Sequence, residues 1–354
     1  MSMLKKPLVV SKVHKYVKEL KKNDGKVGKI PRSITLNYNN ACNFKCVFCF
    51  SEAEKEFTKA HLEFDEIARV ADEAHELGIW EIVLTGGELT TNKETLIKLI
   101  QAFKPERFQM ILISNGYLLT PEYAKELAQA GLDCLAVSIS GMNAERFNRE
   151  RGGGRSIKDA HQRALNALDY ASEAGMAAWP NIVFGHYNAK DPDLFALLEY
   201  AKKKKFTSYL MMAMPFGSLK EDRMTAEDFK ILDGIRKNYD VCFNTWDMYD
   251  KTKEKISGCW TVNRTYITPL GEVLVCPYIN ISIGNIKTQS LGEILNYGFS
   301  IKYFGEFSPI CISAHNVKFR EKFMPEDRTI FTPYKAKEIF SKADYISEDS
   351  NAWG

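Results

Sequence analysis

Three of the chain's eight cysteines lie within eight positions, at Cys42, Cys46 and Cys49 in the stretch ACNFKCVFCF. A disulfide would need an oxidising compartment, and the opening residues Met-Ser-Met-Leu-Lys-Lys show no apolar run of the signal-peptide kind. A zinc site would need a fourth ligand nearby, but the next Cys or His is His61. The spacing fits neither helix nor strand periodicity, which argues against three core thiols. These residues therefore favour an iron–sulfur cluster held by three thiolates, with a fourth iron open to a small ligand.

The spacing Cys42-x3-Cys46-x2-Cys49, with Phe48 before the last thiol, resembles the cluster motif of the radical S-adenosylmethionine (SAM) superfamily. The resemblance covers about residues 33 to 320. It implies a 4Fe-4S cluster whose fourth iron is chelated by the amino and carboxylate groups of SAM. It also implies reductive cleavage of SAM to a 5′-deoxyadenosyl radical, which removes a hydrogen atom from an unactivated carbon while the protein excludes water.

The stretch LTGGELT resembles the Gly-Gly-Glu motif of that superfamily and places Gly86, Gly87 and Glu88 at a predicted strand end. Two glycines there would let the backbone approach a ligand closely. The resemblance assigns Glu88 to the ammonium group of SAM, and a carboxylate suits that contact because the hydrogen bond is charge-assisted. Leu89 follows where the family usually has proline, a departure that affects turn geometry more than chemistry.

Three further positions resemble family contacts to SAM. After the fourth predicted strand, Ser140 replaces the family's usual acid, which leaves Ser138 as the candidate ribose contact. Arg151, in NRERGGG, matches the arginine that pairs with the SAM carboxylate, and Arg149 is its rival. Asn188, in HYNAKD, occupies a position where the family often has asparagine, and a turn-forming role is the ordinary alternative.

A second set of cysteines follows the barrel region. Cys259 and Cys276 flank the stretch TPLGEVLV, in which Gly271 predicts a turn between two strands. Such a hairpin would bring the two thiols together. With Cys311 beyond it, the pattern resembles the SPASM/Twitch extension of radical SAM enzymes. The resemblance implies one auxiliary iron–sulfur cluster of the 4Fe-4S type, held by these three cysteines.

The fourth ligand of this auxiliary cluster stays open between His315, Cys242 and an iron left free for substrate. Cys242 is also the candidate catalytic thiol, because a thiol can return a hydrogen atom to a substrate radical. Cys134 lies within the predicted strand DCLAVSIS and is predicted to be a core thiol.

The elements that must position these residues follow a regular rhythm. Six apolar strands alternate with amphipathic helices over about 190 residues, which predicts a parallel sheet with helices outside. Six units fall short of the eight in a closed barrel. The predicted fold is therefore α/β, a partial (β/α)6 TIM-like barrel of the radical SAM type with a small C-terminal SPASM/Twitch-like β-hairpin extension. We divide the chain into a helix and linker (1–30), the core barrel (31–240), the auxiliary cluster region (241–320) and a C-terminal tail (321–354).

Composition sets the remaining bounds. Of 354 residues, 45% are hydrophobic and 26% are charged, as in an ordinary soluble globular protein. A net charge of +3 is too small to indicate a nucleic-acid partner, and no run of about 18 apolar residues indicates a membrane span. Eight cysteines without a secretory signal predict a cytoplasmic location.

The main hypothesis for the substrate is a small metabolite, sugar-like or aminocyclitol-like. The small number of C-terminal cysteines resembles the family's small-molecule members, and the first 30 residues are too few for a leader-peptide-binding domain. The outcome would be oxidation if the auxiliary cluster accepts an electron, or epimerisation if a thiol returns a hydrogen. The alternative is a radical SAM maturase of a ribosomally made peptide or protein side chain. A non-catalytic iron–sulfur electron carrier would leave Glu88 and Arg151 without a purpose. A flavodoxin- or ferredoxin-type reductant is the expected electron donor.

Overall fold

The computed structural model describes residues 5–49, 59–152, 157–213, 219, 222–242, 258–325 and 328–346. Within these residues, eleven strands form one sheet in the order β11-β10-β9-β8-β1-β2-β3-β4-β5-β6-β7. The strands β1 to β7 pair consecutively and in parallel. They are β1 (Ser33–Asn37), β2 (Glu81–Thr85), β3 (Gln109–Ser114), β4 (Cys134–Ser138), β5 (Ala177–Phe184), β6 (Ser208–Met212) and β7 (Val241–Cys242).

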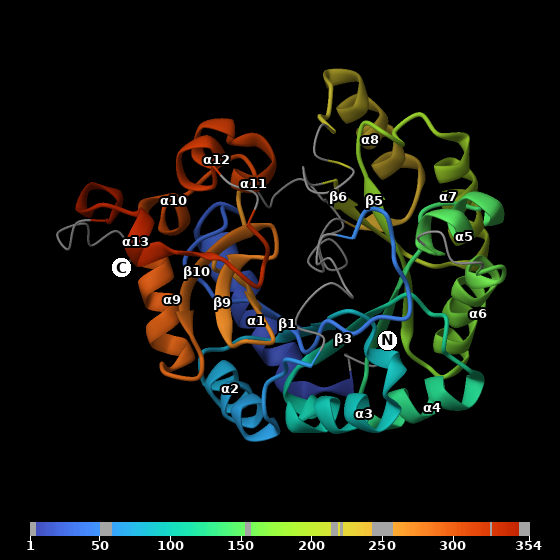
Figure 1. Cartoon of the computed structure of the whole chain (residues 1–354), viewed down its shortest axis with the longest axis horizontal. Helices are drawn as coiled ribbons and strands as arrows, with labels where there is room; N and C mark the ends of the chain where they lie inside the picture. The colour runs from blue at the N-terminus through green and yellow to red at the C-terminus, as the bar shows by residue number, and fades with distance from the viewer. Residues whose placement is uncertain are drawn as a thin grey trace.

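Helices cover the outer face of the curved sheet, which Figure 1 shows as an open horseshoe with the C-terminal extension at one end and α7 and α8 at the other. The partial barrel predicted from the strand–helix alternation is thus confirmed. Within the described barrel, the short helix α5, the helix α8 and the strand β7 were not predicted. The helices are α2 (Phe64–Glu76), α3 (Lys93–Ala102), α4 (Pro121–Ala130), α5 (Ala144–Gly152), α6 (Ala160–Glu173), α7 (Pro192–Lys204) and α8 (Ala226–Asn238).

The ends of these helices are specified by the sequence. Before α4, the Thr120 side chain accepts a hydrogen bond of 3.2 Å from the Tyr123 amide, and Pro121 occupies the first helical position. The helix ends at Gly131, whose φ of 106° lies in the left-handed region that glycine adopts without a steric penalty. Local signals therefore fix where this strand–helix unit turns back.

The first helix, α1 (Pro7–Lys22), lies under the amino ends of the barrel strands. Its apolar face packs on the fully buried Trp80, which directly precedes β2, and the rings of Tyr16 and Trp80 are 6.0 Å apart. The Lys6 ammonium forms an ion pair with Asp133, directly before β4, and donates to the Gly131 carbonyl at 3.1 Å. This helix thus closes the end of the barrel opposite the predicted chemistry. No helix of the described chain is both long and apolar enough to cross a membrane.

The C-terminal extension continues the same sheet rather than forming a separate one. The predicted hairpin is confirmed, because β8 (Arg264–Ile267) and β9 (Glu272–Cys276) pair antiparallel. On its other side β8 pairs in parallel with β1, so the extension joins the open edge of the barrel. Further along, β10 (Ile279–Asn285) pairs with β9, and β11 (Tyr334–Lys335) pairs with β10.

The remaining helices belong to the C-terminal region. They are α9 (Leu291–Ser300), α10 (Lys302–Gly305), α11 (Ile312–His315), α12 (Val317–Phe323) and α13 (Ala336–Ile339). There, α10, α12 and Phe340 form an aromatic cluster. In the cluster, the rings of Phe323 and Phe340 are 4.7 Å apart, and those of Tyr303 and Phe319 are 5.2 Å apart. Aromatic packing of this kind stabilises beyond the area that it buries. The tail segment, which the sequence left uninterpreted, thus packs against the extension through Phe340 and β11.

Candidate functional site

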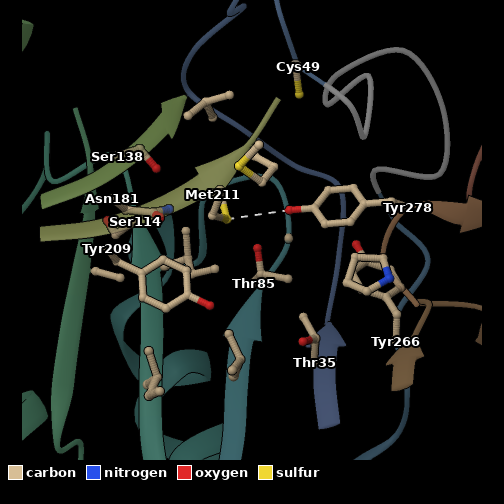
Figure 2. A pocket seen from close by; sticks show the side chains of 18 of the residues that line it. Thr35, Cys49, Thr85, Ser114, Ser138, Asn181, Tyr209, Met211, Tyr266 and Tyr278 are labelled. Atoms are coloured by element: carbon tan, nitrogen blue, oxygen red, sulfur yellow. Dashed lines mark hydrogen bonds between the residues drawn. The ribbon is translucent and has the colours of Figure 1, made fainter. Parts of the chain in front are cut away.

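A cavity of about 850 Å³ opens at the carboxyl ends of the barrel strands, with one wall supplied by the extension. Figure 2 shows one polar side chain from each of β1 to β5 around it. These side chains are Thr35, Thr85, Ser114, Ser138 and Asn181. From the opposite wall, the Tyr278 hydroxyl donates to the Met211 sulfur at 3.5 Å. The cavity therefore lies between the barrel and the extension.

Cys42, Cys46 and Cys49 all line this cavity. Their loop is anchored to the end of α5, since the amides of Lys45 and Val47 donate to the carbonyls of Arg151 and Glu150, at 3.2 and 3.0 Å. This pairing brings a loop that follows β1 against a helix that follows β4.

Two thiols of this first triad, Cys42 and Cys46, are held in an environment that disfavours their free anionic form. Burial raises the pKa of Cys42 to about 12, against a backbone hydrogen bond of 3.3 Å from the Phe44 amide. Burial likewise raises the pKa of Cys46, although the neighbouring positive charge of Arg151 opposes the shift. A metal centre that binds thiolates would displace the thiol protons and supply the missing positive charge.

No three Cys, His, Asp or Glu side chains in the described residues converge as the ligands of a single metal ion would. A 4Fe-4S cluster does not require such convergence, because each thiolate binds a separate iron of a bulky centre. Three thiols spread along a cavity wall fit a cluster better than they fit a single zinc ion. The described residues of this site are thus compatible with the predicted cluster.

Gly86 and Gly87 line the cavity, but their backbone serves the cysteine loop first. A Cβ atom on Gly87 would lie 2.0 Å from the Ala41 carbonyl oxygen, and one on Gly86 would lie 2.4 Å from that of Asn39. The Gly87 amide donates to that Asn39 carbonyl at 2.8 Å. The close approach that requires glycine is therefore made to the segment before Cys42, which gives this pair a structural reason in addition to any ligand contact.

Glu88 is almost completely buried in the cavity wall, with 2% of its surface exposed. Its carboxylate accepts hydrogen bonds from the Thr90 amide (3.1 Å) and hydroxyl (2.6 Å), the Ser114 hydroxyl (2.8 Å) and the Asn115 amide (2.6 Å). Burial nevertheless raises the pKa of Glu88 above its ordinary value. A cationic ligand in the cavity would offset that burial cost, because an opposite charge favours the ionised carboxylate.

Two of the other predicted SAM contacts lie in the cavity wall. Ser138 is the last residue of β4, opposite Asn181 of β5, and both line the cavity. Arg151 also lines it, and its guanidinium lies 5.0 Å from the ring centres of both Phe48 and Phe147. Its buried Nε has no hydrogen-bond partner within the described part of the chain, so this donor is available to a ligand.

Asn188 and Cys242 lie elsewhere, and here the structure differs from the sequence-based assignment. The Asn188 side chain accepts from the Gly185 amide and donates to the Val183 carbonyl, both at 2.9 Å, and it does not line the cavity. Its amide is thus used to form a turn. Cys242 is 1% exposed and packs in the inner layer of the barrel, outside the cavity lining. The structure gives no support to its role as hydrogen donor. Cys134, in the same layer, is buried as predicted.

The second triad, Cys259, Cys276 and Cys311, lines the same cavity from the opposite side. A hydrogen bond from the Cys311 thiol lowers the pKa of Cys259, and the Ile312 amide adds a second donor at 3.4 Å. Burial raises the pKa of Cys276 to about 12. These three thiols fit the predicted auxiliary cluster, since the hairpin and the start of α11 bring them together.

The fourth ligand of that cluster is not identified by the described residues. The Cys242 thiol belongs to the inner layer of the barrel, as described above, rather than to the cavity wall. The side chain of His315 lies outside the described part of the structure. His315 and an iron left free for substrate therefore both stay predictions.

Several wall residues were missed by the sequence interpretation. They include Glu81, Trp179, Tyr209, Arg264 and Tyr278, all of which line the cavity. The rings of Trp179 and Tyr209 stack at 6.1 Å with an interplanar angle of 12°. The sequence signal for these residues was that alternate residues of a strand point to the same face of the sheet. This signal identifies the cavity-lining residues only once the strand order is known.

Two family models match this chain. The radical SAM superfamily model matches residues 36–198, and the iron–sulfur cluster-binding domain model known as SPASM matches residues 259–321. These matches confirm SAM and iron–sulfur clusters as cofactors at the level of the family. Both cysteine triads lie within the matched regions.

Curated relatives span several activities. The chain is 25% identical to the GTP 3′,8-cyclase of Campylobacter curvus, covering 76% of this chain and 87% of that protein. It is 24% identical to the AdoMet-dependent heme synthase of Methanosarcina barkeri, covering 75% and 82%. It is 25% identical to the PqqA peptide cyclase of Bradyrhizobium diazoefficiens, covering 70% and 67%. None of these names indicates a sugar or aminocyclitol substrate.

Solved structures share the fold. Streptococcus suis SuiB bound to its precursor peptide SuiA superposes with a TM-score of 0.59 at 17% identity, covering 80% of this chain and 68% of that one. The protein anSMEcpe with bound AdoMet gives a TM-score of 0.58 at 16% identity, covering 83% and 97%. With the partial barrel and the two matched domains in the expected order, these findings show that the chain belongs to the radical SAM superfamily and carries a C-terminal SPASM domain.

Proposed function

We propose that this protein is a radical SAM enzyme that modifies a side chain of a peptide or protein in the cavity between its two cysteine triads. One observation carries the proposal: Cys42, Cys46 and Cys49 line the same 850 Å³ cavity as Cys259, Cys276 and Cys311. A substrate group in this space would lie between the site predicted to bind SAM and the predicted auxiliary cluster.

A peptide substrate is supported better than the sugar-like or aminocyclitol-like metabolite expected from the sequence. The relatives and structural neighbours include a peptide cyclase and a protein solved with its precursor peptide, whereas the metabolite classes expected here are absent from the relatives named above. The alternative of a peptide-modifying maturase therefore replaces our first hypothesis.

A nucleotide substrate such as GTP is the second candidate, because several curated relatives are GTP 3′,8-cyclases. The described cavity wall argues against it. Its cationic side chains are Lys45, Arg151 and Arg264, and its anionic ones are Glu81 and Glu88. This balance leaves roughly one positive charge, which is poor compensation for a triphosphate.

The residues have distinct roles in this proposal. Cys42, Cys46 and Cys49 would hold the first cluster, and Cys259, Cys276 and Cys311 the auxiliary one. When bound, the first cluster and SAM supply the hydrogen-abstracting 5′-deoxyadenosyl radical, and the auxiliary cluster supplies an electron acceptor. The carboxylate of Glu88 would receive the ammonium group of SAM.

The remaining wall groups orient the bound molecules. The guanidinium of Arg151 would pair with the SAM carboxylate, and the Ser138 hydroxyl would contact the ribose. The stacked rings of Trp179 and Tyr209 present apolar surface that excludes water from the reacting carbon. A cytoplasmic location and a flavodoxin- or ferredoxin-type reductant stay predictions.

The test is an anaerobic assay of the reconstituted protein with SAM and dithionite, in which 5′-deoxyadenosine and peptide mass changes are measured. Synthetic peptides encoded by small reading frames beside the gene serve as substrates, with GTP in a parallel reaction. Formation of 5′-deoxyadenosine together with a mass change in a peptide supports the proposal. Consumption of GTP without a peptide product would favour the nucleotide alternative, and no SAM cleavage would favour an electron carrier.

A further inference from the structure

Arg264 is the first residue of β8, and its half-buried side chain lines the cavity on the extension side. Its register partner on β1 is Ser33, and the partner of Ser33 on the other side is Glu81 of β2. Arg264 and Glu81 are therefore two strands apart at the same level of the sheet, with backbones about 10 Å from each other. Both side chains line the cavity below the polar strand ends.

The guanidinium of Arg264 has few partners for its five N–H donors. Its Nη1 donates to the Tyr209 hydroxyl over a long distance of 3.4 Å. Its buried Nε finds no hydrogen-bond partner in the part of the chain that the structure describes. A buried cationic donor without a partner is costly, so such a group in a cavity wall indicates a missing acceptor.

The charges around Arg264 do not balance. Arg32 is fully buried between the rings of Trp80 and Trp260, and its guanidinium lies 3.4 Å from the Glu81 carboxylate. The Glu81 carboxylate thus forms an ion pair with Arg32. Within the described residues, it forms no ion pair of 4.0 Å or less with the guanidinium of Arg264. Among these three side chains, two arginines face one glutamate, which is an excess of one positive charge, and Oε1 of Glu81 accepts no hydrogen bond within the described residues.

We propose that Arg264 binds a carboxylate of the substrate, either an Asp or Glu side chain or the C-terminal carboxylate of the peptide. The inference rests on the proposed function, since it names the substrate group that this cavity takes. A monoanion matches the single excess charge, whereas a phosphate dianion would also face the carboxylate of Glu81. The planar guanidinium suits a planar carboxylate geometrically.

The residues around Arg264 favour a substrate in which methylene groups adjoin the carboxylate. The Tyr209 hydroxyl is the hydrogen-bond partner of the guanidinium, and the Tyr209 ring stacks on that of Trp179. An anchored carboxylate would hold the methylene groups of an acidic side chain against this aromatic surface. Arg264 would then act as a specificity-determining residue, selecting acidic over amide side chains.

The competing role for Arg264 is electrostatic support of the auxiliary cluster. Its charge acts on the Cys276 thiol in the direction that lowers the pKa, although burial outweighs this effect. If that were its purpose, replacing Arg264 would change the iron content or the reduction potential of the cluster. Iron content and the EPR spectrum of the reduced protein therefore accompany each binding measurement below.

The first experiment measures binding of benzoate and benzamide to the reconstituted holoprotein by equilibrium dialysis. Benzoate combines one carboxylate with an aromatic ring that fits the Trp179–Tyr209 wall, and benzamide is its neutral isostere. We expect the native protein to bind benzoate at least tenfold more tightly than benzamide, and Arg264→Gln to lose that preference. Arg264→Lys, which keeps the charge, should retain part of it. Arg163→Gln removes an exposed ion pair on α6 and should behave as the native protein does.

Three outcomes overturn the inference: no preference for benzoate in the native protein, equal preference in Arg264→Gln, or loss of iron or a changed EPR spectrum in both Arg264 variants. A second experiment separates this inference from the proposed function. The holoprotein is incubated with pools of hexapeptides that differ only in Glu or Gln at one position, and retained peptides are identified by mass spectrometry. Enrichment of the Glu pool, dependent on Arg264, supports both proposals. Benzoate selectivity with no peptide retained supports the carboxylate site and contradicts the peptide substrate.

Discussion

The two cysteine triads line the same cavity but are built in different ways. Cys42, Cys46 and Cys49 come from one loop, which hydrogen-bonds to the end of α5. Cys259, Cys276 and Cys311 come from three separate segments, the start of the extension, the end of β9 and the residue before α11. The first site therefore depends on local backbone geometry, whereas the second depends on correct folding of the whole extension.

The electrostatic settings of the two triads differ at one thiol, Cys259. Burial raises the pKa of Cys42 in the first triad to about 12, as it does for Cys276 in the second. At the second triad, a hydrogen bond between two of the thiols lowers the pKa of Cys259. All three cysteines of the second triad belong to the extension, and none comes from the loop that supplies the first triad. We infer that the two sites can be disabled separately, and the following variants test this.

The largest effect is expected from replacing Cys42, Cys46 and Cys49 together by alanine. This triple variant should abolish 5′-deoxyadenosine formation, because no thiolate would remain to hold the SAM-binding cluster. Iron content should fall from about eight to about four per chain, since the second triad is built from other segments. Iron analysis and product quantification measure both, and a variant that retains its full iron would refute the assignment.

The reciprocal variant, Cys276→Ala, should lose about half of the iron as well, but should still cleave SAM. Its product should be 5′-deoxyadenosine with little modified peptide, because the substrate radical would lack its electron acceptor. Running the reaction in deuterated water distinguishes the two possible outcomes. Deuterium in the modified peptide would indicate that a thiol quenched the substrate radical. A peptide that has lost two electrons and carries no deuterium would indicate dehydrogenation. Circular dichroism must show an intact fold, because loss of a structural cluster can unfold its domain. Native turnover by a folded variant would contradict this role.

The same contrast explains what could be predicted from the sequence. The cysteine loop, Gly-Gly-Glu and the alternating strands and helices are short-range patterns, so the barrel and the first triad were predicted. The hairpin was predicted too, but not the parallel pairing of β8 with β1 that makes Arg264 part of the cavity wall. Asn188 was assigned to SAM on the family resemblance, whereas its side chain bonds the turn at Gly185, the alternative that the sequence also offered.

A smaller effect is expected from Glu88→Gln, which keeps the shape of the side chain but removes its charge. The loss of one charge-assisted hydrogen bond to the SAM ammonium should weaken SAM binding by about 1.5–3 kcal/mol, roughly 10- to 150-fold. Both clusters should assemble normally, since Glu88 is assigned to the ligand and not to iron. Equilibrium dialysis with SAM measures the affinity. Ser114→Ala removes one donor to this carboxylate without changing any charge, so it should weaken binding less.

The smallest effect, and the finest test of the comparison, concerns a glycine turn on each side of the molecule. Gly271 in the β8–β9 turn and Gly175 after α6 have nearly the same backbone angle, φ 85° and φ 84°. An alanine at either position should cost about 1–2 kcal/mol in the free energy of unfolding, because that region is strained for residues with a Cβ. At Gly175 nothing lies within 4 Å of the added atom, whereas at Gly271 it would lie 2.7 Å from Oδ1 of Asn285.

That side chain matters to the hairpin. Oδ1 of Asn285 accepts from the Lys287 amide at 2.9 Å, and its Nδ2 donates to the Leu270 carbonyl at 3.2 Å. Displacing Asn285 should therefore make Gly271→Ala more destabilising than Gly175→Ala by roughly 1 kcal/mol. Because the turn joins the strands that position Cys276, only Gly271→Ala should also reduce auxiliary cluster occupancy, while SAM cleavage persists in both variants. Chemical denaturation, iron analysis and the 5′-deoxyadenosine assay measure these quantities. Equal iron loss in the two variants would show that the extension is not the more fold-dependent of the two sites.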